Sequence, residues 1–121
     1  MTTPSGHTSA IRGKKVIGTT VKDMAGTTIG EVEDVVLDKE SSKIMFAVIS
    51  FGGFLGIGEK YHPIPWSALN YVPDEDAYMV KYTKDQLEAA PHDTIEELTR
   101  DNGVSYRDRS YDYYGVARDW Q

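Results

Sequence analysis

The sequence predicts an all-β protein, in which a small, strongly bent sheet closes into a β-barrel and short helices follow at the C-terminal end. Three observations lead to this fold class. About six short segments rich in β-branched residues are separated by polar turns. The segment at residues 43–51 is apolar on both faces, so both faces must be covered. The chain has 121 residues, of which 40% are hydrophobic and 26% charged, and this composition is typical of one globular domain.

The N-terminal segment is polar before the first strand begins. Residues 1–10 consist mainly of Thr, Ser, Pro and Gly without apolar periodicity, which indicates a flexible tail. Residues 16–21 are rich in Val, Ile and Thr and favour a strand. A turn is expected at residues 23–26, because Gly26 can adopt a positive φ.

The next two segments predict a β-hairpin that carries the centre of the core. In the strand at residues 29–37 the apolar alternation changes phase near Glu33 and Asp34, and a β-bulge is the usual cause of such a change. The polar residues 38–42 connect this strand to the one at 43–51. One face of the second strand would fill the barrel, while the other must meet a helix, the C-terminal tail or a second subunit.

A glycine-rich segment at residues 52–58 follows, with too many glycines for a regular element. Residues 61–64 form a short strand, which Pro63 and Pro65 confine to a sheet edge or a barrel rim. Pro65 is also well placed to open a single helical turn over residues 66–69.

The last strands precede a helix with a recognisable start signal. Residues 70–72 and 77–82 predict a hairpin, and in its second arm the tyrosines share one face. Thr83 and Gln86 match a capping box, with Thr83 as the N-cap of a short helix over residues 84–90.

The C-terminal end combines a second helix with an aromatic tail. A helix is expected from about residue 94 to 100, with Asp93 as its N-cap. Residues 104–121 interleave Tyr and Trp with Arg and Asp and are too aromatic for a disordered linker. The predicted organisation is a tail at 1–10, a barrel domain at 11–90 and a helical, aromatic extension at 91–121.

Composition excludes several functions. The chain has no cysteine, which removes disulfides, thiolate metal sites and cysteine nucleophiles. Its 13 Lys and Arg against 19 Asp and Glu give a net charge of −6, which disfavours non-specific binding to nucleic acid or anionic lipid. The longest apolar run, residues 44–49, is too short to span a membrane, and the N-terminus lacks a signal-peptide pattern. We therefore expect a cytoplasmic protein without membrane insertion.

No motif in the sequence indicates a catalytic or cofactor site. His7, His62 and His92 do not have a metal-binding spacing, and no serine lies in a GxSxG motif. The glycines of residues 52–58 lack the GxGxxG order and the following helix of a dinucleotide-binding motif. The paired carboxylates lack the ligand spacing of a calcium loop. The expectation is a protein that is not an enzyme and has no cofactor or metal.

Three stretches carry a resemblance to a known family: Ile29-Gly30-Glu31-Val32-Glu33-Asp34-Val35-Val36-Leu37-Asp38, residues 46–58, and Ile64-Pro65-Trp66-Ser67-Ala68-Leu69. In order and spacing they resemble the PRC-barrel family, which is named after the cytoplasmic domain of the photosynthetic reaction-centre H subunit. The resemblance extends over about residues 11–90. Residues 111–116 with Trp120 are similar to the C-terminal extension of some bacterial stand-alone members. The resemblance implies a compact β-barrel that acts as an interaction module and has no catalysis of its own.

The predicted function is protein interaction with self-association, most simply as a homodimer, and the partner is unknown. The two-faced strand, the glycine-rich segment and the aromatic tail hold more apolar surface than one small domain is expected to hide. The glycine-rich segment and the tail could pack in the same chain or on a neighbouring subunit. The candidate contact residues are Phe51, Phe54, Leu55, Ile57, Trp66, Tyr111, Tyr113, Tyr114 and Trp120.

Two alternative functions stay open from the sequence. One is a small-ligand-binding protein or enzyme with a pocket near His62 and Trp66, which a cavity with convergent polar groups would favour. The other, by family analogy, is an accessory role in RNA or ribosome maturation or in a photosynthetic membrane complex. A basic face and steeply salt-sensitive binding would distinguish the RNA role.

Overall fold

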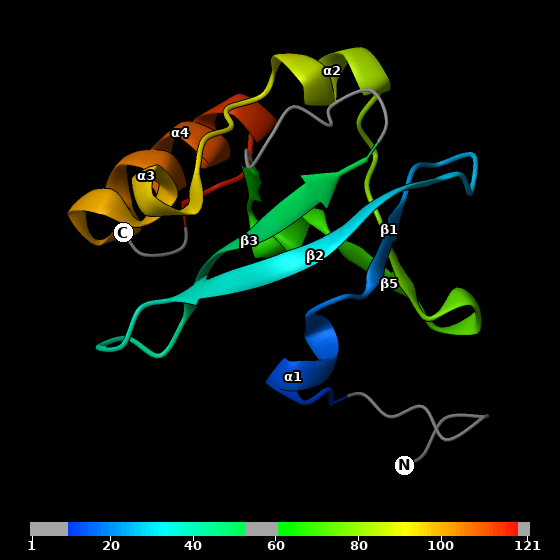
Figure 1. Ribbon diagram of the computed structural model, residues 1–121, viewed down its shortest axis with the longest axis horizontal. Coiled ribbons are helices and arrows are strands. Elements are labelled where there is room, and N and C mark those ends of the chain that lie inside the picture. The colour runs from blue at the N-terminus through cyan, green and yellow to red at the C-terminus, as the bar shows by residue number, and fades with distance from the viewer. Residues whose placement is uncertain (1–9, 53–60, 119–121) are drawn as a thin grey trace.

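The computed structural model describes residues 10–52 and 61–118 (Figure 1). The helices and strands are α1 (Gly13–Val16), β1 (Thr20–Lys22), β2 (Thr28–Leu37), β3 (Ile44–Phe51), β4 (His62–Ile64), β5 (Asn70–Val72), β6 (Ala77–Met79), α2 (Lys84–Ala89), α3 (Ile95–Thr99) and α4 (Val104–Tyr114). Short 3-10 turns lie at Trp66–Ala68, Pro73–Glu75 and Arg100–Gly103.

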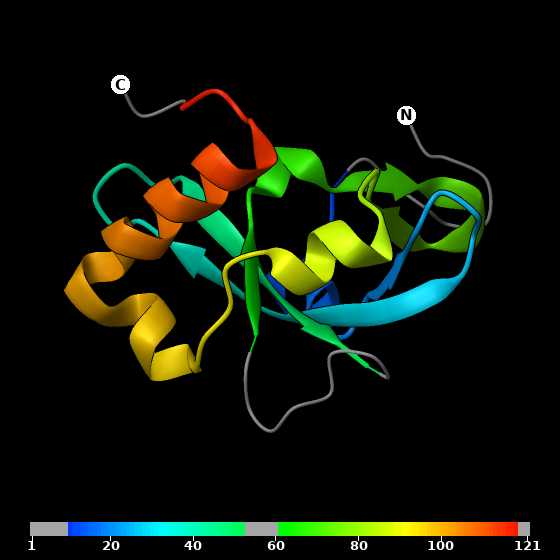
Figure 2. The same cartoon turned by 90° about the horizontal axis from the view of Figure 1, so that it is seen from above.

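All six strands join one sheet in the order β4-β3-β2-β1-β6-β5. β1 and β6 pair in parallel, and the other neighbouring strands are antiparallel. The strands at the two edges of the sheet, β4 and β5, follow each other in the chain, so the sheet bends round and forms a half-barrel. The helices α2, α3 and α4 lie together along one side of this half-barrel (Figure 2). The predicted bent sheet with short C-terminal helices is confirmed. Within the described residues, no helix combines the length and apolarity needed to cross a membrane.

A bulge in β2 sets how its side chains divide between core and solvent. The register between β2 and β3 shifts between Val32 and Asp34, which confirms the β-bulge predicted there. Val32 is fully buried, whereas Glu33 and Asp34 are exposed. The extra residue thus lets Val32 stay buried while the two following acidic side chains both face solvent.

Both faces of β3 are covered, as its sequence requires. Ala47, Ile49 and Phe51 belong to the main core, which the bent sheet encloses. Phe46 and Val48 instead pack with the fully buried Leu98 of α3 in a second apolar cluster. The chain's own C-terminal helices therefore cover the second face, which the sequence could assign equally to a second subunit.

The first predicted strand is shorter than expected. Residues 16–21 were expected to be extended, but α1 ends at Val16 and β1 begins only at Thr20. Between them Gly18 has a φ of 89°, in the left-handed region that glycine adopts readily. Its N–H donates to the carbonyl of Val32 at 2.7 Å, so this turn attaches the end of α1 to β2.

The C-terminal extension is more helical than predicted. Residues 104–114 form α4, which is bounded by Gly103 and Gly115 with φ of 75° and 67°. The N-cap of α3 is Thr94, whose hydroxyl accepts from the N–H of Glu97 at 3.2 Å. The prediction of Asp93 as N-cap was wrong, because its carboxylate accepts from the N–H of Thr94 instead.

The capping box at the start of α2 is confirmed and offers a test of local stability. The Thr83 hydroxyl accepts from the Gln86 N–H at 3.1 Å, and the Gln86 side chain accepts from the Thr83 N–H at 2.8 Å. Thr83→Ala is expected to lower the free energy of unfolding by about 1 kcal/mol, because it leaves a helix N–H without its partner. Urea denaturation measures this, and an unchanged midpoint would contradict it.

Candidate functional site

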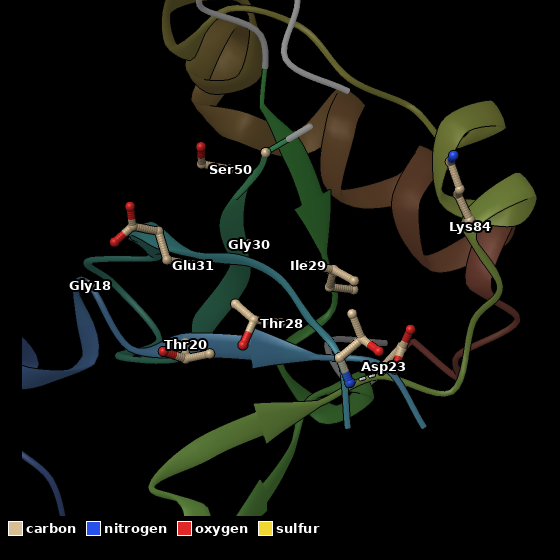
Figure 3. A pocket seen from close by; sticks show the side chains of 11 residues that line it. Gly18, Thr20, Asp23, Thr28, Ile29, Gly30, Glu31, Ser50 and Lys84 are labelled. Carbon is tan, nitrogen blue, oxygen red and sulfur yellow. Dashed lines mark hydrogen bonds between the residues drawn. The ribbon is translucent and has the colours of Figure 1, made fainter. Parts of the chain in front are cut away.

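A cleft of about 760 Å³ opens where β1, β2 and the end of β3 face α2 (Figure 3). Thr20 and Thr28 contribute hydroxyls from β1 and β2, and Lys84 lies at the start of α2 beside the cleft (Figure 3). The complete lining is Gly18, Thr20, Asp23, Thr27, Thr28, Ile29, Gly30, Glu31, Ser50, Gly52 and Lys84. Neither His62 nor Trp66, around which the sequence suggested a pocket, lines this cleft.

The two acidic side chains of the cleft, Asp23 and Glu31, differ in whether they are free to contact a bound molecule. The Asp23 carboxylate accepts from the N–H groups of Ala25 and Thr27 at 2.9 and 3.0 Å, so it holds the turn between β1 and β2. Glu31 is exposed at the opposite end of the cleft, above Gly18 (Figure 3). The cleft therefore offers hydroxyls and separated charges, an arrangement suited to contact with a polar partner.

Gly30 forms the part of the cleft wall where β2 meets β3. It pairs with Phe51 in the sheet. A Cβ atom placed on Gly30 would lie 2.2 Å from the carbonyl oxygen of Ser50, which is closer than real Cβ contacts allow. Only glycine permits this approach of the two backbones.

His62, on β4, is a packed aromatic residue. It is only 2% exposed, and neither ring nitrogen has a hydrogen-bond partner among the described residues. Its ring meets Phe51 edge-on at 5.0 Å and stacks on His92 at 4.9 Å between centroids. Burial, with a smaller contribution from His92, lowers the pKa of His62 to about 4, so the ring is neutral at pH 7.

Two of the predicted contact residues near the sheet mainly serve packing. Phe51 is 4% exposed and belongs to the main core. Trp66 is half-buried and packs edge-on against Tyr78 at 5.3 Å. Phe51 therefore offers no contact surface in the folded chain, because the interior of the half-barrel already encloses it.

The tyrosines of the predicted tail divide between core and surface. Tyr111 and Tyr114 are buried within the chain, and Tyr114 packs against Tyr82 at 4.7 Å. Tyr113 is 41% exposed, and its hydroxyl donates to the carbonyl of Gln86 at 2.6 Å. Through α4 the described part of the tail thus packs on its own subunit, and of its four described tyrosines only Tyr113 is exposed. Phe54, Leu55, Ile57 and Trp120 lie outside the described residues.

The exposed apolar side chains gather in a part of the chain that sequence reasoning did not select. Among the described residues, the large exposed ones include Ile11, Ile17, Met24 and Leu37, all within the first 37 positions. The C-terminal helices lie on the other side of β2 and do not cover α1 (Figure 1). The sequence signal that could have found this surface is the placement of Ile11 and Ile17 beside basic residues in a short segment.

Comparison with known protein families agrees with the geometry. The PRC-barrel domain matches residues 9–87, which is more than half of the chain and includes all six strands. No curated protein matches this sequence. The resemblance seen in the sequence is thereby confirmed, and the chain belongs to the PRC-barrel domain family.

Proposed function

We propose that this chain is a non-catalytic protein-interaction module that acts in the cytoplasm and self-associates as a homodimer. The observation that carries the proposal is the apolar surface of the first third of the chain. Met24 is 68% exposed, Leu37 57%, Ile11 45% and Ile17 41%. Exposed apolar groups that lie close together commonly mark interaction sites, and Ile11 and Ile17 lie on either side of the short helix α1. Met24 and Leu37 lie near opposite ends of β2 and extend the exposed apolar surface along this strand.

Burial of these side chains supplies a reasonable driving force for association. Removing a large aliphatic side chain fully from water stabilises by about 1.5–3 kcal/mol. These residues are already partly covered, so each contributes only part of that amount. Several of them acting together are needed to exceed the cost of lost rotational and translational freedom.

The state of His62 supports the absence of catalysis in this proposal. A general base must reach the proton that it removes within about 2.6–3.2 Å, directly or through one water. The His62 nitrogens are buried and contact no hydroxyl donor among the described residues. In the cleft, the Asp23 carboxylate already accepts two backbone N–H groups.

Sedimentation velocity at micromolar concentration tests self-association. We expect a species of twice the 13.5 kDa chain mass that dissociates on dilution. A species that keeps the monomer mass at every concentration would contradict the homodimer. The Ile11→Ser/Ile17→Ser variant is expected to favour the monomer, with Tyr113→Ser as a control for an exposed residue on the other side of the molecule.

The volume of the cleft and the hydroxyl and charged side chains on its wall favour a second candidate, the binding of a small ligand with polar groups. A library of polar small molecules, followed by amide chemical shifts, tests it. Saturable shifts at Thr20, Thr28 and Gly30 would support the ligand site. A library without effect on these three amides would oppose it.

A further inference from the structure

Positive charge is concentrated at the N-terminal end of the chain. The first 22 residues contain four Lys or Arg and no Asp or Glu, whereas the other 99 contain nine Lys or Arg and all 19 acidic residues. Three of the four, Arg12, Lys14 and Lys15, lie in and directly before α1, and all three are exposed. None of them forms an ion pair within the part of the chain that the structure describes.

These cations lie beside exposed aliphatic side chains. Ile11 precedes them and is 45% exposed, and Ile17 follows them and is 41% exposed. We call Ile11, Arg12, Lys14, Lys15 and Ile17 the basic patch. Because Val16, the inward-facing residue of α1, is buried, the helical turn is anchored and the patch faces outward.

An acidic patch, Glu31 and Glu33, lies next to the basic patch on β2. The N–H of Gly18 donates to the carbonyl of Val32 at 2.7 Å, and the N–H of Val32 donates to the carbonyl of Thr19 at 2.9 Å. These bonds place the chain just after α1 against β2, level with both glutamates. Glu31 and Glu33 are exposed, and neither forms an ion pair with another described residue.

We propose that the two patches form the self-association surface, in which the basic patch of one copy contacts the acidic patch of a second copy and the reverse contact forms at the same time. This inference rests on the proposed function. A two-fold axis requires a surface complementary to itself, and neighbouring patches of opposite charge satisfy that requirement. Ile11 and Ile17 supply the apolar part of the contact, which charges alone would not provide.

A second copy fits this surface better than other partners of the cations. Anionic lipid or nucleic acid would be attracted by Arg12, Lys14 and Lys15 but repelled by the adjacent Glu31 and Glu33. The patch also pairs its cations with aliphatic residues instead of the aromatic ones on which unpaired bases stack. Opposite charges placed side by side are instead the arrangement that a reciprocal protein contact uses.

The test is a charge-swap experiment on the full chain. One variant is Lys14→Glu/Lys15→Glu and the other is Glu31→Lys/Glu33→Lys, so that each brings like charges together in both halves of the contact. Each variant alone is expected to lose about tenfold or more in dimer association constant, because like charges oppose each other. An equimolar mixture of the two is expected to form a heterodimer, because the swapped patches are complementary again.

The matched control is Lys39→Glu/Lys81→Glu, which makes the same change in net charge at exposed positions away from α1. It is expected to dimerise like the natural chain. Circular dichroism melting checks that each variant is folded. The natural dimer should also weaken as salt is raised, since the screening length falls from about 10 Å at 0.1 M to about 3 Å at 1 M.

The other outcomes separate this inference from the proposed function. A natural dimer that persists in both swapped variants would overturn the assigned surface and leave self-association intact. A natural chain that is always monomeric would overturn self-association and the assigned surface together. Binding of that monomer to phosphatidylserine vesicles or single-stranded RNA, lost in Lys14→Glu/Lys15→Glu, would assign the basic patch to lipid or nucleic acid instead.

Discussion

Replacing Gly30 with alanine is expected to lower the free energy of unfolding by about 3 kcal/mol or more, the upper range for overpacking. The new Cβ would lie 2.2 Å from the carbonyl oxygen of Ser50 and 3.0 Å from the Cα of Phe51. Both obstacles are backbone atoms of β3, so no side-chain rotation relieves the clash. The strands must separate at the end of β3, where Gly30 pairs with Phe51.

A matched substitution distinguishes this clash from a general effect of removing glycine. Gly13, in α1, has no heavy atom within 4 Å of a Cβ placed on it. Gly13→Ala is therefore expected to change stability by no more than about 1 kcal/mol, in the stabilising direction if it acts through helix propensity. Urea denaturation of both variants is the measurement. Equal midpoints for the two would show that β2 and β3 are less tightly joined at Gly30 than the geometry requires.

Much of the fold could be predicted because it is encoded locally. The phase change at Glu33, the capping box at Thr83 and the helical turn after Pro65 each depend on a few neighbouring residues. The two-faced apolar pattern of β3 also required that both its faces be covered. The parallel pairing of β1 with β6 could not be predicted, because it joins segments far apart in the sequence and has no local signal.

The candidate contact residues show where composition alone falls short. The tail tyrosines were selected as aromatic residues without a helical register. In α4, Tyr111 and Tyr114 are three positions apart and share the buried face, while Tyr113 points outward. The aliphatic residues around α1 were missed because the sequence of residues 16–21 resembles a strand. The left-handed turn at Gly18, which separates α1 from β1, can be recognised only once the hydrogen bond from Gly18 to Val32 is known.

Acidification is expected to destabilise the fold through His62. The folded chain keeps this ring neutral in an apolar site, where it contacts Phe51 and His92. Burial is the main reason that its pKa falls from 6.5 to about 4, and the nearby His92 adds to the effect. The backbone of Leu87 opposes this shift only partly.

The sign of the pH dependence follows from the two states of this group. Between pH 6.5 and about 4 the unfolded chain binds a proton at His62 and the folded chain does not. The unfolded state is therefore favoured increasingly as the pH falls through this range. The contribution of His62 to stability is complete above pH 6.5, and about 3 kcal/mol of it is lost by pH 4.

His62→Phe isolates this contribution, because it keeps an aromatic ring beside Phe51 and cannot take up a proton. We expect urea denaturation between pH 7 and pH 4.5 to show a shallower loss of stability for this variant than for the natural chain, whatever its stability at pH 7. His92→Gln removes only the smaller, electrostatic part of the pKa shift, so its slope should fall between the two. Parallel pH profiles for the natural chain and His62→Phe would mean that His62 is hydrated or paired in solution, which would contradict its burial as a neutral ring.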